Sequence, residues 1–211
     1  VRIKHPKGDF LQLAEVEVFG IPMLNVARGK PAMQSSIART IRDEYDAIRV
    51  PALTMNEGFT LTADVEVAPI NQQSSYGQKY FTLKGDMTDE VYCGQSTDGH
   101  ILCGATQGTA WQQTPQTMSS GGGTNYYGQR FKLSLVVDKR QLTLYINGVS
   151  VGQMPLRRDF RFGHFTAIQF GNSQQYPRQG LNATFYDARI VAKAMTAEEI
   201  SSDPLGGNLA T

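Results

Sequence analysis

The stretch FKLSLVVDKRQLTLYINGVSVGQ, residues 131–153, decides the fold class of this chain. Its apolar side chains alternate at period two through three successive segments, which is the pattern of β-strands with one buried face. Asn147 and Gly148 lie between the second and third segments and suit a type I′ hairpin, because both central residues of that turn need a positive φ. Lys139 and Arg140 can form the other two-residue turn. The stretch therefore predicts a three-stranded antiparallel meander.

The two turns also determine which residues of the meander lie opposite each other. The second turn sets Ile146 opposite Val149 and Leu144 opposite Val151. The first turn gives three apolar pairs, which are Val137 with Leu142, Leu135 with Leu144, and Leu133 with Ile146. All apolar residues then lie on one side of the meander, whereas a slip of one residue would turn them to water. Turn chemistry and apolar pattern thus predict the same register.

Length and charge restrict the class of protein. At 211 residues the chain fits one all-β domain with extensions, and it can bury a sizeable core. The formal charge is +1, with Lys and Arg spread along the chain, so we expect no nucleic acid partner and no anionic membrane surface. No apolar run reaches the roughly 18 residues of a membrane span. The opening VRIKHP lacks the apolar core of a signal peptide, which predicts a mature or trimmed chain.

Other segments carry strand and helix signals of their own. Residues 59–67 alternate strictly, and the pattern predicts a strand with Thr60, Thr62, Asp64 and Glu66 facing outward. Thr196 and Glu199 have capping-box spacing, so we expect a short helix that starts after Thr196 and ends before Pro204. Three further strands are predicted at residues 79–84 (KYFTLK), 167–170 (AIQF) and 184–191 (TFYDARIV). Residues 104–129 have the least pattern, and unpatterned loops of this length are usually functional or disordered.

The N-terminal residues 1–20 read as a β-hairpin with a bulge near Ala14 and Glu15. Two strands alone are marginal in water, so their apolar side chains must be covered. The hairpin either extends a sheet of its own domain or pairs with another subunit, and we favour a homo-oligomer with residues 1–20 near the interface. The predicted domain division is 1–43 for the hairpin and linker, and 44–211 for the main all-β domain with its tail.

The two cysteines lie in VYCGQSTDGHILCG, residues 91–104. A three-residue loop of Thr97, Asp98 and a left-handed Gly99 sets Cys93 opposite Cys103, at a spacing that suits a disulfide. Two buried thiols are the alternative. A disulfide indicates an oxidising compartment, and the sequon at Asn182 agrees with a secreted, glycosylated protein.

Most of the chain shows a family resemblance. The order of strand, cysteine hairpin, meander with YINGV, polar loop and GLNATFYDARIVAKAMTAEEI resembles the concanavalin A-like jelly roll, in its laminin-G-like and pentraxin-like branch. The resemblance covers residues 44–200. It implies an all-β fold of two packed antiparallel sheets, with an N-terminal β-hairpin and a short C-terminal helix added. It also implies an extracellular module that commonly binds sugars and sometimes binds proteins or calcium.

A second resemblance concerns the N-terminal segment. RIKHPKGDFLQLAEVEVFG, within residues 1–20, resembles the closing strands of a discoidin-like, coagulation-factor type C domain of the fucolectin kind. NVARGKPAMQSS, residues 25–36, resembles the opening of the next such domain. The body of that fold does not follow, and the basic residues and histidines with which fucolectins hold fucose are missing. The resemblance implies a lectin-like context without a site.

The candidate sugar-binding residues lie in polar loops that combine aromatic and amide side chains. Sugar recognition needs an aromatic face to stack on the ring, and amides or charged groups to bind the hydroxyls. The candidates form four clusters, which are Trp111 with Gln112 and Gln113; Asn125 with Tyr126 and Tyr127; Gln174 with Tyr176 and Arg178; and Asn71 with Gln73 and Tyr76. The alternative is that the amides are simply solvated and that Trp111 pins its loop to the core.

Metal and catalytic signals are weak by comparison. Asp86, Asp89 and Glu90 are hard oxygen ligands in one turn and are candidates for calcium, with a solvated acidic turn as the favoured alternative. The three histidines His5, His100 and His164 share no metal-binding spacing.

The jelly-roll superfamily includes laminarinase-like glycoside hydrolases, which place two carboxylates along one strand. Asp64 and Glu66 are the only such pair that we identify here, and they alternate as an ordinary polar face. No nucleophile elbow, P-loop or dinucleotide fingerprint is present. The sequence predicts a secreted, non-catalytic lectin; the alternatives are an adhesion module that binds protein partners and a glycoside hydrolase.

Overall fold

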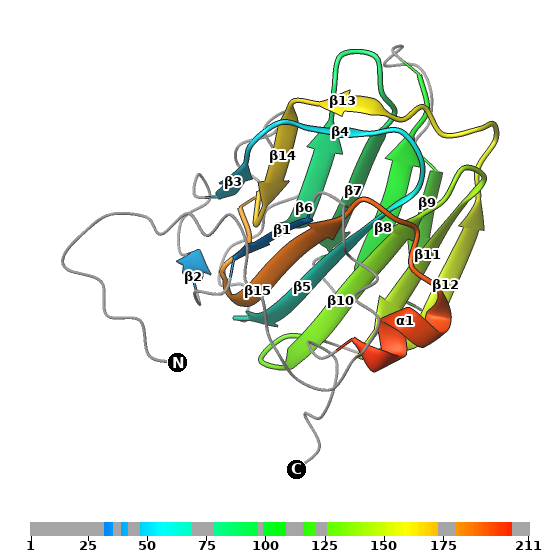
Figure 1. Cartoon of the computed structure of the whole chain (residues 1–211). Coiled ribbons are helices and arrows are strands. Elements are labelled where there is room, and N and C mark those ends of the chain that lie inside the picture. The colour runs from blue at the N-terminus through cyan, green and yellow to red at the C-terminus, as the bar shows by residue number, and fades with distance from the viewer. Residues whose placement is uncertain are drawn as a thin grey trace, which may run out of the picture.

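The fold is an antiparallel β-sandwich, seen here in a computed structural model (Figure 1). The structure describes residues 32–35, 39–41, 47–68, 78–96, 99–108, 116–120, 126–172 and 180–203. For residues 32–35, 39–41 and 116 the description is limited to the backbone. The predicted hairpin at residues 1–20 lies outside the described residues and stays a prediction, as does the division into domains at residue 43.

Two large sheets form the sandwich. The first has seven strands in the order β1, β15, β5, β10, β11, β12, and β2 also pairs with β15. Its strands are β1 (Ala32–Ser35), β2 (Arg39–Ile41), β5 (Phe59–Val67), β10 (Arg130–Val137), β11 (Gln141–Ile146), β12 (Val149–Pro155) and β15 (Ala183–Val191). The second has six strands, which in order are β3 (Ile48–Val50), β14 (Ala167–Phe170), β6 (Gln78–Lys84), β7 (Glu90–Gln95), β8 (Ile101–Thr106) and β9 (Gln116–Ser119).

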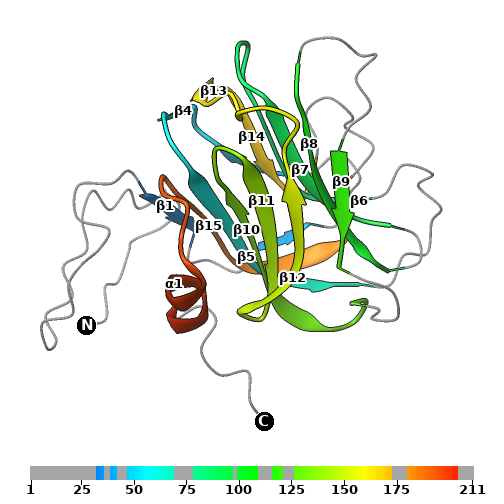
Figure 2. The ribbon, with the colours of Figure 1, turned by 90° about the vertical axis from the view of Figure 1, so that its right-hand side faces the viewer.

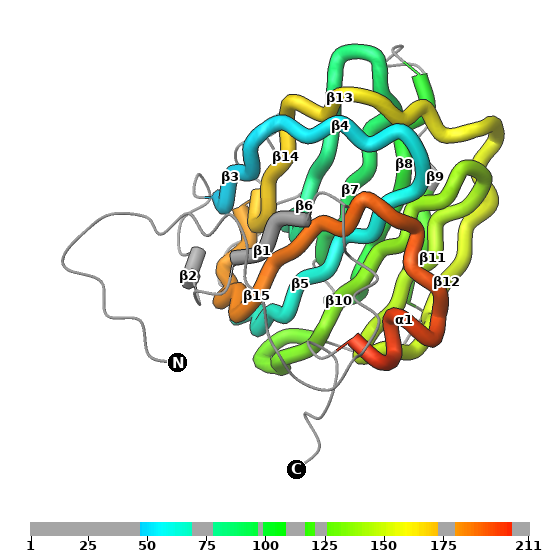
Figure 3. Tube along the Cα trace, viewed as in Figure 1, coloured from blue at the N-terminus to red at the C-terminus, as the bar shows by residue number. Residues whose placement is uncertain are grey.

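A small two-stranded sheet lies across one end of the sandwich. It pairs β4 (Leu53–Met55) with β13 (Gly163–Phe165), and the two strands run side by side along the top of the chain trace in Figure 3. β5 runs through the middle of the seven-stranded sheet, from Phe59 to Val67. We therefore call the two ends of the sandwich the Phe59 end and the Val67 end. The small sheet lies toward the Phe59 end, where the Phe59 and Phe165 rings are 5.6 Å apart.

The core lies between the two large sheets, and the period-two pattern of the strands accounts for it. Phe59, Leu61, Ala63, Val65 and Val67 of β5 all face inward and are fully buried. Across the core lie inward residues of the six-stranded sheet, among them Phe81, Leu83, Val91, Ile101 and Phe170. The predicted all-β jelly-roll sandwich is therefore confirmed.

The meander of residues 131–153 forms β10, β11 and β12. All three predicted pairs between β10 and β11 are present, as is the pair of Ile146 with Val149. Asn147 has a φ of 50° and Gly148 a φ of 80°, so the turn has the positive φ values that the sequence predicted.

The register of β12 differs from the prediction beyond its second residue. Leu144 lies opposite Gly152 instead of Val151, because Val151 is the extra residue of a β-bulge. The bulge brings Met154 opposite Leu142, and Met154 is buried. Val149 was predicted to face the core but is 65% exposed, at the start of an edge strand that has a neighbour on one side only. Both expectations for β12 were wrong.

The outward face of β5 was also predicted incorrectly. Thr60, Thr62 and Asp64 are buried instead of solvated. The chain that follows β15 crosses this face: Thr60 Oγ1 donates to the Lys193 carbonyl at 2.8 Å and accepts from the Met195 amide at 3.0 Å. Polar residues of a central strand are thus buried by a segment that is far away in the sequence, the chain after β15.

The C-terminal helix α1 (Ala197–Ser202) confirms its predicted position. Thr196 and Glu199 form the capping box, with the Thr196 amide donating to Glu199 Oε2 at 2.9 Å. Ile200 is fully buried against Val136 and Tyr145. Figure 2 shows α1 on the outer side of the seven-stranded sheet, away from the six-stranded sheet. The helix therefore covers one outer face of the sandwich.

A buried ionic cluster ties the end of α1 to the sheet. Lys132 Nζ lies 3.1 Å from Asp203 Oδ2, and each side chain is only 2% exposed. Arg189 forms a second ion pair with Asp203. Burial, and then the charge of Arg189, lower the pKa of Lys132 to about 8, against the opposing charges of Asp64 and Asp187.

This shift predicts that stability increases at alkaline pH. The pKa of Lys132 lies below its ordinary value of 10.5, so between about pH 8 and 10.5 the unfolded chain binds a proton that the folded chain does not. The free energy of unfolding should then rise across this window, by up to about 3 kcal/mol at ~1.36 kcal/mol per pH unit. Urea unfolding of the wild type and of Lys132→Met at pH 7.5 and 10.5 measures this rise in the free energy of unfolding. Equal changes in both proteins would contradict the assignment.

Candidate functional site

Three of the four predicted loops are bordered by strand ends that lie at the same end of the sandwich. Arg130 pairs with Glu66 at the start of β10, and Ala183 pairs with Val67 at the start of β15, so the starts of these two strands lie at the Val67 end of β5. The loop candidates Asn71, Gln73, Tyr76, Asn125, Gln174, Tyr176 and Arg178 lie outside the described residues. A sugar site at this end stays a prediction.

The strands on either side of the predicted Trp111 loop point to the other end of the sandwich. The loop follows β8, which ends at Thr106 opposite Glu90, and Asp89 contacts Arg158 in the segment after β12. Both strand ends lie toward the Phe59 end. Trp111, Gln112 and Gln113 lie outside the described residues, so the structure does not join this cluster to the other three.

Tyr126 and Tyr127 are described, and they differ in environment. Tyr126 is 8% exposed, and its ring centroid lies 5.0 Å from that of Phe131 in the core. Tyr127 is half-buried, and its hydroxyl donates to the Ser96 carbonyl at 3.1 Å. Tyr126 is thus mainly a packing residue, whereas Tyr127 keeps part of its ring exposed at the Val67 end.

The cysteines form the predicted disulfide. Cys93 lies opposite Cys103 in the pairing of β7 with β8, their Cα atoms are 4.0 Å apart, and both side chains are fully buried in the core. Gly99 has the expected left-handed conformation, with a φ of 86°. The disulfide is therefore an internal link between two neighbouring strands of the six-stranded sheet.

The disulfide should contribute to stability mainly through the unfolded chain. The sequence separation of the cysteines is 10, and the chain-entropy relation gives about 2.5–3 kcal/mol for a loop of this size. Urea unfolding of Cys93→Ala/Cys103→Ala should show a loss of that order. Two thiols that react with an alkylating reagent in the native protein, seen by mass spectrometry, would show that the bridge is not formed.

The acidic turn does not gather its three carboxylates around one point. Asp89 is buried, and its carboxylate accepts from Arg158 at 2.6 and 2.9 Å and from the Arg161 amide at 2.9 Å. Asp86 is exposed, and Glu90 lies at the start of β7. Among the residues that the structure describes, no group of three or more His, Cys, Asp or Glu side chains is placed to hold a metal ion. Asp89 instead fastens the turn to the segment after β12.

Asn182 and two of the histidines are described as well. Asn182 is exposed just before β15, where a glycan could be attached. His164 is exposed and its Nδ1 lies 3.0 Å from Thr54 Oγ1, whereas His100 is half-buried in the turn before β8. His5 lies outside the described residues.

The outer face of the six-stranded sheet carries a group of side chains that the sequence analysis did not select. Tyr92 and Glu90 of β7 point outward, because Val91 and Cys93 point into the core. Lys79 of β6 places its Nζ 4.8 Å from the centroid of the Tyr92 ring. All three side chains are half-buried. We call Lys79, Glu90 and Tyr92 the sheet-face cluster.

The charges of the sheet-face cluster are perturbed by burial. Burial raises the pKa of Glu90, against the opposing charges of Lys84 and Lys79. Burial and the charge of Glu90 raise the pKa of Tyr92 to about 12, so the hydroxyl stays protonated. Within the described part of the chain, neither the Tyr92 hydroxyl nor the Glu90 carboxylate has a hydrogen-bond partner. The described part of the chain therefore leaves the hydrogen-bonding capacity of both groups unused.

Two glycines shape this face. Gly104 lies directly opposite Tyr92 on β8, so no side chain stands beside the ring on that strand. Gly94 lies opposite Lys79 next to a bulge in β6, and a Cβ at Gly94 would come within 2.4 Å of the Gln78 carbonyl oxygen. The close approach of β6 and β7, which puts Lys79 near Tyr92, thus requires glycine at position 94. The alternation of buried and outward side chains around Cys93 was the sequence signal that could have identified Tyr92 and Glu90.

The outer face of the seven-stranded sheet holds the two carboxylates expected of a hydrolase. Asp64 accepts two hydrogen bonds from Arg130, at 3.0 and 2.7 Å. Glu66 accepts from the Tyr186 hydroxyl at 2.7 Å, and the Arg130 guanidinium lies 3.8 Å from the centroid of the Tyr186 ring. The four side chains therefore bind one another.

Comparison with known proteins identifies the family. A family model described as the concanavalin A-like lectin/glucanases superfamily matches residues 42–201. The chain belongs to this superfamily. The predicted resemblance is thereby confirmed for the jelly roll, whereas the discoidin-like resemblance of residues 1–20 and 25–36 lies outside the matched part. A search of curated proteins finds no match.

Several solved structures share the fold of this chain at low sequence identity. Domain 4 of AbnA, an extracellular arabinanase from Geobacillus stearothermophilus solved with arabinotriose, has a TM-score of 0.56 at 17% identity, covering 81% of this chain and 86% of that one. A heptameric SAP-like pentraxin from Limulus polyphemus has a TM-score of 0.55 at 13% identity, covering 79% and 81%. The NanB sialidase from Streptococcus pneumoniae has a TM-score of 0.60 at 16% identity, covering 83% and 28%.

Proposed function

We propose that this chain is a carbohydrate-binding domain of the concanavalin A-like superfamily and that the sheet-face cluster contacts the sugar. The observation that carries the proposal is the half-buried Tyr92 ring with Lys79 and Glu90 beside it and a glycine opposite. An aromatic face stacks on the apolar side of a sugar ring, while a carboxylate accepts from hydroxyls and an ammonium donates to them. The predicted polar loops Asn71 to Tyr76 and Gln174 to Arg178 would add further contacts.

The disulfide, the partners of Asp64 and Glu66, and the arabinanase domain support the wider description of a secreted, non-catalytic lectin. The disulfide of Cys93 and Cys103 is typical of an oxidising compartment. Among the described residues, no helix is both long and apolar enough to cross a membrane. Asp64 and Glu66 already bind Arg130 and Tyr186, which supports a structural role for them over catalysis. The arabinanase domain solved with arabinotriose supports a saccharide ligand for this fold.

Replacement of Tyr92 tests the site. After a glycan array has identified a sugar, Tyr92→Ala should weaken its binding by about 1–3 kcal/mol, the usual cost of truncating an aromatic contact. Tyr186→Ala is the matched control, because Tyr186 lies on the outer face of the other sheet. Titration calorimetry measures both, with thermal unfolding to confirm folding.

Three outcomes would argue against this proposal. Equal affinity of wild type and Tyr92→Ala would remove the sheet-face cluster from the site. An empty glycan array together with binding to extracellular proteins would favour the adhesion module. Turnover of a polysaccharide that disappears in Glu66→Gln would favour a glycoside hydrolase.

We also propose a homo-oligomer built through residues 1–20. The apolar side chains of this segment need a cover, and linked copies raise the avidity of a weak sugar site. The heptameric pentraxin shows that a chain of similar fold can assemble. Deletion of residues 1–20 should abolish red-cell agglutination and leave monovalent sugar affinity unchanged, as measured by agglutination and calorimetry. A wild-type protein that sediments as a monomer at micromolar concentration would refute this assembly.

A further inference from the structure

A row of outward residues crosses the whole six-stranded sheet and passes through the sheet-face cluster. The strand pairings align Arg49 with Gln169, Gln169 with Thr82, Thr82 with Tyr92, Tyr92 with Gly104, and Gly104 with Thr117. We call these residues the cross-strand row. They belong in turn to β3, β14, β6, β7, β8 and β9, which follow one another from left to right in Figure 1.

The cross-strand row lies on the outer face of the sheet and reaches both of its edges. Thr82, Gln169 and Tyr92 each stand between two buried core residues, and the residues on either side of Arg49 also pack against the core. The row begins on β3 and ends on β9, which are the outermost strands. Because neighbouring strands lie about 4.8 Å apart, the row spans roughly 24 Å. A single sugar ring covers only a small part of that length.

The two ends of the row carry exposed polar side chains. Arg49 is exposed, and within the described part of the chain it has no hydrogen-bond or ion-pair partner. Thr117 is exposed at the other end. Guanidinium and hydroxyl groups form hydrogen bonds with sugar hydroxyls, and the Tyr92 ring between them provides a stacking face. Groups that suit a saccharide are therefore distributed along the row instead of gathered at one point.

The residues next to Tyr92 favour a ligand that follows the row. Thr82 and Gly104 are its neighbours within the row, and both are short and buried. Glu90 lies on one side of the row, and Leu102, which is 37% exposed, lies on the other, because β7 and β8 are antiparallel. A ligand that rests on Tyr92 therefore meets shorter side chains along the row than across it.

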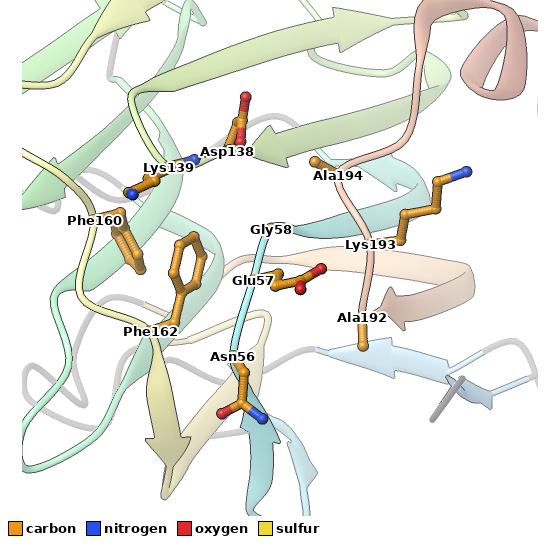
Figure 4. A pocket seen from close by; sticks show the side chains of 10 residues that line it. All are labelled: Asn56, Glu57, Gly58, Asp138, Lys139, Phe160, Phe162, Ala192, Lys193 and Ala194. Carbon is orange, nitrogen blue, oxygen red and sulfur yellow. Dashed lines mark hydrogen bonds between the residues drawn. The ribbon is translucent and has the colours of Figure 1, made fainter. Parts of the chain in front are cut away.

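The pocket at the Phe59 end does not present a continuous surface of this kind. Its volume is about 770 Å³, and none of its lining residues belongs to the cross-strand row. Figure 4 shows the turn of residues 56–58, with the Glu57 side chain, between the Phe160 and Phe162 rings and the segment of residues 192–194. This turn divides the pocket, whereas the cross-strand row continues over every strand of its sheet.

We propose that the cross-strand row binds an internal stretch of a linear polysaccharide, several sugar rings long. One ring stacks on Tyr92, and rings farther along the chain contact Arg49 on one side and Thr117 on the other. A single terminal sugar would leave both ends unused, because they lie roughly 14 and 10 Å from Tyr92 at the usual strand spacing. This inference rests on the proposed function, since it assigns a substrate class to the same site.

The dependence of affinity on chain length tests this proposal. Titration calorimetry of the full chain compares oligosaccharides of one to eight rings from linear 1,5-arabinan, β-1,4-glucan, xylan, mannan and chitin. In a series that binds, we expect affinity to rise about tenfold or more between two rings and five and then to level off, because further rings add hydrogen bonds only until the row is filled. Equal affinity for one ring and for five, or no binding of an eight-ring member of any series, would overturn the proposal.

Variants at the ends of the row distinguish this proposal from the sugar site itself. Arg49→Ala and Thr117→Ala should each weaken a six-ring chain about two- to tenfold, the effect of one lost hydrogen bond, and leave a two-ring chain unchanged. Arg140→Ala is the control, because Arg140 is an exposed arginine in the turn between β10 and β11 of the other sheet.

Tyr92→Ala completes the comparison. We expect it to weaken the two-ring and the six-ring chain alike, because Tyr92 contacts a ring in both. If Tyr92→Ala weakens both chains but the two end variants weaken neither, the sugar site stands and the polysaccharide assignment is wrong. If Tyr92→Ala weakens neither chain, the proposed sugar site is wrong as well.

Discussion

The requirement that each strand hide one face between two sheets governs the rest of this molecule. Phe59 to Val67 alternates in the centre of the seven-stranded sheet, and every second residue is fully buried. At roughly 25 cal/mol per Å² of apolar area, a row of such residues contributes far more than any single polar contact. Turns, bulges and outward side chains are then constrained by that choice of face. The position of Tyr92 follows directly, because its neighbours Val91 and Cys93 must point inward.

The two outer faces of the sandwich differ in what covers them. The seven-stranded sheet carries α1, with Ile200 packed on Val136 and Tyr145, and the buried ion pairs of Asp203. Such buried pairs are costly to break, since removal of one partner leaves an uncompensated charge. The six-stranded sheet instead presents the sheet-face cluster, whose polar groups have no hydrogen-bond partners within the described part of the chain. Ligand binding is therefore better supported on the face that α1 does not cover.

Local signals were sufficient where local physics decides the outcome. The type I′ turn at Asn147 and Gly148, the capping box of Thr196 and Glu199, and the pairing of Cys93 with Cys103 all depend on residues close together in the sequence. The errors arise from distant partners. Thr60 is buried because the chain after β15 crosses it, and nothing near residue 60 indicates that contact.

The same difference between local and distant contacts explains why several candidate site residues were predicted incorrectly. The polar loops were predicted from their composition, and composition does not tell which polar groups already have partners within the chain. Asp89 looked like a calcium ligand, yet its carboxylate is taken by Arg158, whose residue number is 69 higher. Tyr126 looked like a ligand contact, yet its ring packs against Phe131. Tyr92 was read only as part of a cysteine hairpin, although a period-two reading of that hairpin already turns it outward.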